Sequence, residues 1–151
     1  MKILSYKEVI NSGIEFTGDV CFSGEYGQQV YTSEMEDGGI PVNGILYELY
    51  PNGKLNYYAF YENGIPNGER VNFYDSGELK SYCIMEEGTI RGEHTEWYQN
   101  GTIKLQENCR YGFILNRKEF DDNGNIVYEK EVLTESEKEA YEKRVQYYEG
   151  K

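Results

Sequence analysis

The chain is poor in the residues that build metal sites. Its 151 residues include one histidine, His94, and three cysteines, Cys21, Cys83 and Cys109, with no CxxC spacing. Structural zinc sites need closely spaced pairs of cysteine or histidine ligands. We therefore predict no metal site and no cofactor, and we expect the cysteines to be reduced and to act as small buried hydrophobic residues.

Long hydrophobic runs are also missing. The first residues, MKILSYKEVINSG, hold only the apolar fragment Met1 to Leu4 before polar residues intervene, and the mean hydropathy of the chain is -0.76. A signal peptide or a membrane span needs a much longer apolar stretch. The expected location is the cytoplasm, away from any membrane.

Positive charge is scarce. The 15 Lys and Arg against 27 Asp and Glu give a formal net charge of -12. Such a field repels the phosphates of nucleic acids and anionic lipid headgroups. The charge favours a basic protein as partner, because complementary potentials steer association. Alternatively, the acidity only keeps a tyrosine-rich surface soluble.

Tyrosine and glycine are abundant, and they recur at fixed spacing. The chain has 16 Tyr and 17 Gly, which favour strands and tight turns respectively. Segments NGILYELYPNGKL from Asn43, NGERVNFYDSGEL from Asn67 and RGEHTEWYQNGTI from Arg91 align without a gap, with a period of 24 residues. A fourth copy, LNRKEFDDNGNIV from Leu115, is shorter by one residue. The length and the repeats indicate a single repeat domain over 1–151, with a divergent N-terminal cap unit at 1–38 and repeats at 39–128.

Each repeat has the pattern of a β-hairpin. Asn-Gly or a similar pair stands between two β-forming runs, and we expect positive φ at the turn glycines Gly53, Gly77 and Gly101. The predicted fold is an all-β repeat, a meandering antiparallel sheet of about four to five 24-residue hairpin units. A C-terminal helix is predicted at 132–149, because Thr134 and Glu137 have the spacing of a capping box. We expect it to cap the open edge of the sheet, although its tyrosines could instead contact a partner.

Alternation along the strands predicts two faces. Leu49, Phe73, Trp97 and Phe120 should form a core ladder beside Leu55, Leu79, Ile103 and Ile126. The opposite face should carry Glu48 and Glu96, with Tyr50, Tyr74 and Tyr98 in one ladder and Tyr58 and Tyr82 in another. Because Tyr50, Tyr74 and Tyr98 recur strictly, a structural role suits them better than binding.

The pattern Y-x-N-G-x-L, with a glycine about six residues before the tyrosine, resembles the MORN-variant repeats of the YwqK-type antitoxin or immunity family. The resemblance covers residues 39–128 and departs from the pattern at Asn116, at a one-residue deletion near Asp121 and in the C-terminal segment. It implies a cytoplasmic binding protein that neutralises a toxin encoded nearby. The alternative is a structural or scaffold repeat module with no toxin partner.

No catalytic residue is predicted. His94 occupies a variable outward position with no nucleophile near it in the pattern. Glu48 and Glu96 lie two units apart, on the order of 20 Å at a strand spacing of about 4.8 Å, whereas paired carboxylate catalysis needs at most about 9.5 Å. The glycines are not followed by GKS or GKT, so they do not form a phosphate loop.

The candidate site is therefore a surface for a protein. Tyrosine is enriched at interface hot spots, and carboxylates complement a basic toxin. The predicted partner-binding residues are Glu48, Tyr58, Tyr82, Glu96 and Tyr147. On this hypothesis Tyr82→Ala and Glu96→Lys weaken binding while leaving the sheet folded.

Overall fold

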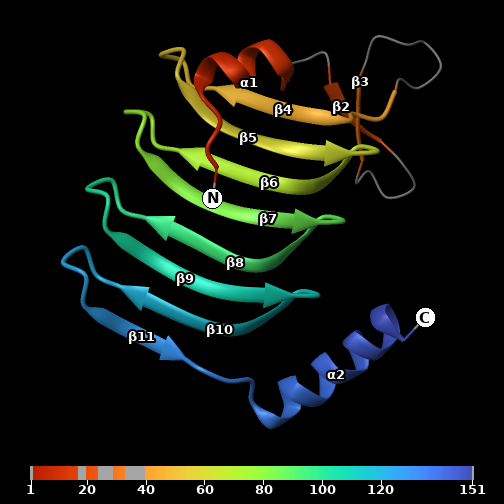
Figure 1. Ribbon diagram of the computed structural model, residues 1–151, viewed down its shortest axis with the longest axis vertical. Coiled ribbons are helices and arrows are strands. Elements are labelled where there is room, and N and C mark those ends of the chain that lie inside the picture. The colour runs from red at the N-terminus through yellow and green to blue at the C-terminus, as the bar shows by residue number, and fades with distance from the viewer. Residues whose placement is uncertain (1, 17–19, 24–28, 33–39, 151) are drawn as a thin grey trace.

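The computed structural model describes residues 2–16, 20–23, 29–32 and 40–150, and within them hairpin follows hairpin in one large sheet (Figure 1). The helices and strands, in chain order, are α1 (Tyr6–Ser12), β1 (Ile14–Glu15), β2 (Val20–Ser23), β3 (Gln29–Thr32), β4 (Gly44–Leu49), β5 (Leu55–Glu62), β6 (Ile65–Phe73), β7 (Leu79–Glu86), β8 (Thr89–Trp97), β9 (Ile103–Arg110), β10 (Phe113–Phe120), β11 (Ile126–Lys130) and α2 (Glu135–Glu149).

The strand order follows the chain. Nine strands of the described residues pair in the order β1-β4-β5-β6-β7-β8-β9-β10-β11, antiparallel throughout except that β1 pairs in parallel with β4. This arrangement confirms the predicted all-β repeat, with two strands in each 24-residue unit. In the region of the predicted cap unit, 1–38, β2 and β3 form a separate two-stranded sheet, and the end of this unit lies outside the described residues.

The hairpin turns hold the predicted conformation. The Tyr50 amide donates to the Lys54 carbonyl and the Gly53 amide donates to the Tyr50 carbonyl, each at 2.8 Å. Gly53, Gly77 and Gly101 have φ of 86°, 106° and 91°, values that glycine adopts readily because it has no Cβ and that L-amino acids adopt rarely.

Gly77→Val tests this turn geometry. A Cβ added at Gly77 would meet no atom within 4 Å, so any cost arises from its positive φ rather than from a clash. We expect the free energy of unfolding to fall by roughly 1–3 kcal/mol. The control is Glu129→Val at an exposed position of β11, which should change stability far less. Equal urea midpoints for the two variants would contradict the strained turn.

The repeated tyrosines connect consecutive hairpins. The hydroxyls of Tyr50, Tyr74 and Tyr98 donate to the carbonyls of Phe73, Trp97 and Phe120 at 2.6, 2.6 and 2.7 Å. The donor and acceptor lie 23, 23 and 22 residues apart, and the last, shorter separation coincides with the one-residue deletion of the fourth copy. The geometry therefore gives these tyrosines the structural role that their strict recurrence suggests.

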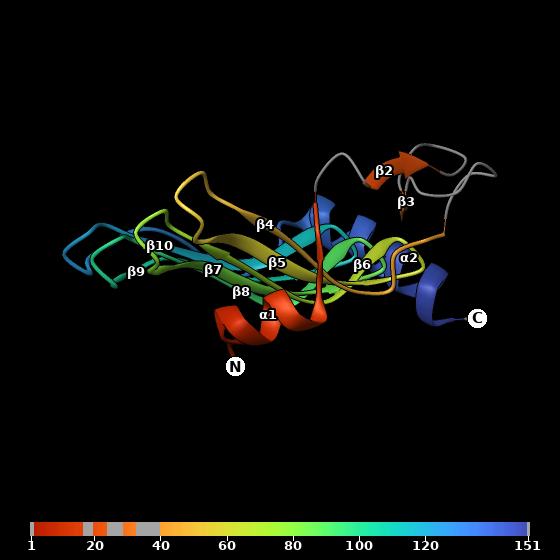
Figure 2. The ribbon, with the colours of Figure 1, turned by 90° about the horizontal axis from the view of Figure 1, so that it is seen from above.

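The N-terminal helix α1 covers one end of the sheet and was missed by the sequence analysis. Figure 2 shows it on one side of the sheet, with β2 on the other. Its start is fixed by a capping box between Ser5 and Glu8, a signal that the sequence does contain. Val9 of α1 is fully buried in a core cluster with residues of three strands, β4, β5 and β6: Ile45, Tyr47, Leu55, Tyr58 and Val71. We call the side of the sheet that carries α1 the helix face.

Candidate protein-binding surface

Cross-strand pairing assigns a face to the four predicted site residues that lie on strands, Glu48, Tyr58, Tyr82 and Glu96. On the helix face one continuous row of paired residues runs Tyr47, Tyr58, Val71, Tyr82, Thr95 and Gln106. On the opposite face, which we call the network face, the matching row runs Leu46, Ala59, Arg70, Cys83, His94, Glu107 and Arg117. Glu48 and Glu96 also lie on the network face, because Glu48 pairs with Tyr57 and Glu96 with Ser81.

The prediction that Tyr58 and Tyr82 share a face with Glu48 and Glu96 is wrong. Each hairpin has a register shift at its turn end: Leu49 pairs with Leu55, but the preceding Glu48 pairs with Tyr57. This bulge inserts one residue into the returning strand and reverses its alternation. Tyr58 and Tyr82 therefore lie on the helix face.

Tyr58 is not available to a partner, so its place among the binding residues is also wrong. Its side chain has 0% exposure, and its hydroxyl accepts a hydrogen bond from the Leu4 amide at 2.8 Å. The ring packs at 6.2 Å from Phe73 and edge-on at 6.5 Å from Phe60. Tyr58 holds the N-terminal segment on the sheet.

Tyr82, one unit further on, is half-buried in an open groove of the helix face. The groove has a volume of about 420 Å³. Its other lining residues are Ile84, Glu93, Thr95, Trp97, Ile103 and Gln106. Trp97 and Ile103 belong to the predicted core ladder and do pair with each other, but this part of the ladder lies beyond α1 and lines the open groove. Tyr82 is thus a predicted binding residue that remains partly accessible in a groove with apolar lining residues.

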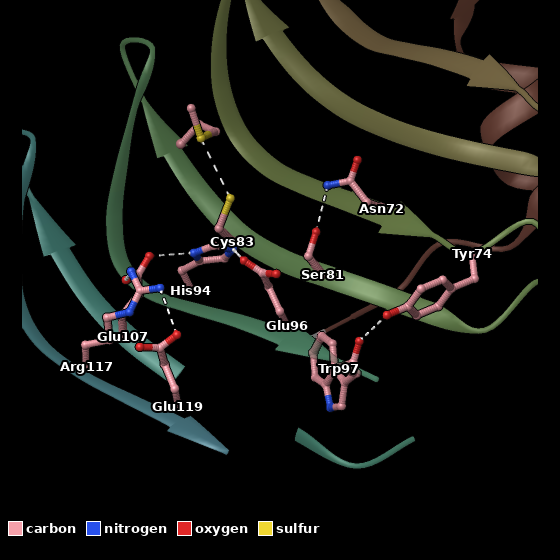
Figure 3. A network of polar contacts seen from close by, with 11 residues as sticks. Asn72, Tyr74, Ser81, Cys83, His94, Glu96, Trp97, Glu107, Arg117 and Glu119 are labelled. Carbon is pink, nitrogen blue, oxygen red and sulfur yellow. Dashed lines mark hydrogen bonds and ion pairs between the residues drawn. The ribbon is translucent and has the colours of Figure 1, made fainter. Parts of the chain in front are cut away.

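A network of charged side chains occupies the network face (Figure 3). Glu107, with only 6% exposure, accepts from His94 Nδ1 at 2.8 Å and from Arg117 Nη1 at 3.1 Å. His94 Nε2 lies 3.5 Å from Glu96, and Arg117 Nη2 lies 3.4 Å from Glu119. The expectation of a surface histidine is wrong, because the His94 side chain has 15% exposure and lies between two carboxylates. Glu96 thus already has a partner inside the sheet.

The thiols beside this network are held protonated. Cys83 and Cys109 are free and buried, as expected, whereas the Cys21 side chain lies outside the described part. Burial raises the pKa of Cys109 to about 12, with the neighbouring Glu107 adding to the effect, and burial also raises the pKa of Cys83. A thiol with so high a pKa is a poor nucleophile at neutral pH. The cluster therefore has the character of a structural network.

The C-terminal helix is confirmed, but it does not cover the edge of the sheet. The capping box of Thr134 and Glu137 starts α2, whose Tyr148 stacks on Tyr111 of the β9–β10 turn at 4.8 Å. Arg144 Nη1 donates to the Tyr111 carbonyl at 3.0 Å. Figure 1 shows α2 leading away from β11, where Ile126, Val127 and Tyr128 remain exposed. The helix packs beside a turn because its aromatic and cationic residues find partners there.

Tyr147 lies on this helix at 60% exposure, in edge-on contact with Tyr148 at 5.0 Å. Glu48 lies on the network face beside Tyr57, whose pKa burial raises to about 12. The five predicted residues are therefore spread over the helix face, the network face and α2. A single flat partner surface could not contact them all, and the roles of Glu48, Glu96 and Tyr147 in binding stay predictions.

The start of α2 should loosen in acid. Glu137 Oε2 lies 2.7 Å from Lys130 Nζ and Oε1 accepts from the Thr134 amide, and these bonds lower the pKa of Glu137 from 4.5 to about 2. A lowered folded-state pKa contributes stability above pH 4.5 that is lost as pH falls toward 2. We expect the amide signals of the first turn of α2 to lose dispersion over this range. In Glu137→Gln they should already be perturbed at pH 6 and change little more in acid.

Two features are absent from the described residues, 2–16, 20–23, 29–32 and 40–150. In that part of the chain, neither helix is long and apolar enough to cross a membrane. The same residues contain no group of three or more His, Cys, Asp or Glu side chains arranged to hold a metal ion.

Comparison with known proteins identifies similar sequences. Residues 42–64 and 91–108 match the family described as MORN repeat variant; the first match covers the β4–β5 hairpin and the second most of the β8–β9 hairpin. The chain is 44% identical over 130 residues to the immunity protein YwqK of Bacillus subtilis (strain 168), an alignment that covers 86% of this chain and 83% of that protein. No solved structure matches.

Proposed function

The chain belongs to the family of MORN-variant repeat proteins that includes the immunity protein YwqK, and from this we propose that it is itself an immunity protein. On this proposal it binds a cognate toxin directly and neutralises it, without catalysing a reaction. The observation that carries the proposal is the identity of 44% across most of both chains. The expected location is the cytoplasm, which suits the two buried free thiols.

The surface and charge of the molecule support a protein partner of basic character. The net charge of -12 favours association with a positively charged protein. The open groove at Tyr82 offers apolar surface with a carboxylate, Glu93, in its lining. Large aromatic side chains in such a position are typical of interface hot spots.

Co-expression with the product of the adjacent gene tests the function. We expect the wild-type chain to rescue growth of a host that expresses this product and to co-purify with it, as identified by mass spectrometry. The matched binding variants are Tyr82→Ala in the groove and Glu96→Lys on the other face. Loss of rescue in Tyr82→Ala alone would place the interface on the helix face, and loss in Glu96→Lys alone would place it on the network face. Absence of both rescue and co-purification for the wild type contradicts the proposal.

The exposed edge strand favours a second candidate, a structural module that associates with itself. In β11, Val127 is 65% exposed and its neighbours Ile126 and Tyr128 are also exposed. An unpaired apolar edge is a template for pairing with another chain. Light scattering distinguishes the candidates: a scaffold should form dimers or larger assemblies that Val127→Arg dissolves, whereas an immunity protein without this role should be unaffected.

A further inference from the structure

The groove at Tyr82 is a repeat of a surface that already binds a helix. Advancing by the 24-residue period maps Tyr58, Phe60, Phe73 and Leu79 onto Tyr82, Ile84, Trp97 and Ile103. The first set packs in the cluster beneath the N-terminal segment, and the second set lines the open groove. Equivalent strands thus present equivalent apolar shapes, one covered and one uncovered.

The N-terminal segment shows what this shape accommodates. Ile3, Leu4, Val9 and Ile10 all pack in the first cluster, and Val9 is fully buried there. The opposite side of α1 is polar and exposed, with Lys7 and Asn11 in solvent. A short amphipathic helix with an aliphatic side is therefore the ligand that the repeat geometry selects. Since α1 ends at Ser12, it covers only the first of the two surfaces.

The charges around the open groove define the rest of the ligand. Glu93 lines the groove, and Glu69, the equivalent residue one unit earlier, pairs across the strands with Ile84. Among the described residues that line this groove there is no lysine or arginine. Carboxylates at the rim favour a ligand whose aliphatic side is flanked by basic residues.

We propose that the groove between β7 and β9 binds an amphipathic helix of the toxin, whose aliphatic side covers Trp97 and Ile84 and whose basic residues face Glu93. This inference rests on the proposed immunity function and specifies its binding mode. Helix binding in a preformed apolar groove uses side-chain anchors spaced along one helical side. The toxin helix would cover the apolar surface next to the one that α1 covers.

The single tryptophan of the chain provides a direct measurement of occupancy. Trp97 lies in the groove, and a peptide of residues 1–13 contains no tryptophan. The peptide is locked as a helix by a lactam between Lys7 and the carboxylate supplied by Asn11→Asp, both on the exposed side. We expect the emission of Trp97 in the full chain to shift to shorter wavelength and to saturate below about 1 mM peptide. A scrambled locked peptide should give no shift.

A second locked peptide, which differs from the first in charge, provides the matched comparison. The locked peptide with Glu8→Lys should bind several-fold more tightly than the parent at low salt, and the difference should shrink at 1 M salt, where screening extends over only about 3 Å. In Ile84→Arg, which fills the groove with a cation, both peptides should lose at least tenfold in affinity. If the locked peptides leave Trp97 emission unchanged, the groove does not select an amphipathic helix and the inference fails.

Binding experiments with the toxin itself test whether the groove is the site of the interaction. With the product of the adjacent gene, Ile84→Arg should weaken binding at least tenfold and Glu93→Lys several-fold, with unchanged circular dichroism. The control Val127→Arg, an equal change on exposed β11, should bind like the wild type. If the wild type binds the toxin and Ile84→Arg binds it equally well, the groove proposal is overturned while the immunity function stands. If the wild type binds no toxin, the function falls, even where the peptide still shifts Trp97.

Discussion

Replacing Tyr58 by alanine is expected to lower the free energy of unfolding by about 3–5 kcal/mol, the range for truncating a large buried aromatic residue. Tyr58 has no exposed surface, contacts Phe60 and Phe73, and lies in the same cluster as Val9 of α1. Its removal leaves a cavity between helix and sheet that neither element can close alone. Urea unfolding followed by circular dichroism gives the measurement.

The conservative variant separates packing from hydrogen bonding. Tyr58→Phe keeps the ring but removes the acceptor of the Leu4 amide, which should cost about 1 kcal/mol. Tyr82→Ala, at the equivalent position one unit later but without a helix above it, should cost less than Tyr58→Ala. Equal losses at Tyr58 and Tyr82 would show that α1 contributes nothing to the burial of Tyr58.

The repeat period made most of the sheet predictable from sequence. The strict recurrence of Tyr50, Tyr74 and Tyr98 reflects a contact that each unit makes with the next, so the pattern and the contact have the same period. The turn glycines were predictable for a similar reason, since positive φ leaves few alternatives to glycine. Local chemistry also placed α2, through its capping box.

The faces of the strands were harder to predict, because a bulge of one residue reverses the alternation. Counting by twos from Leu55 places Tyr58 outside, whereas the register shift after Glu48 places it inside. The environment of His94 depends on this pairing and on Glu107 and Arg117 from later strands, which are not adjacent in sequence. The groove was not predicted because it is open only where α1 no longer covers the sheet, and α1 itself was not predicted.

Glu107→Ala is expected to lower the free energy of unfolding by about 3 kcal/mol, the lower end of the range for breaking a buried ion pair. The lower end applies because the Arg117 side chain is still 30% exposed and water can solvate part of its charge. The variant leaves Arg117 Nη1 and His94 Nδ1 without the carboxylate that now accepts from both. Removing the Glu107 carboxylate thus leaves two hydrogen-bond donors, one on β8 and one on β10, without their acceptor.

A second variant tests whether the loss of stability comes from the donors left without an acceptor or from the missing Glu107 side chain. The triple change His94→Leu, Glu107→Leu and Arg117→Met replaces the network by apolar side chains of similar size. Such replacements of buried ionic groups are often neutral or stabilising, so we expect the triple variant to be more stable than Glu107→Ala alone, by thermal and urea unfolding. A triple variant less stable than Glu107→Ala would mean that the ionic bonds between β8, β9 and β10 stabilise the sheet in their own right. Because the network face lies opposite the groove, both variants should bind the toxin as the wild type does while they remain folded.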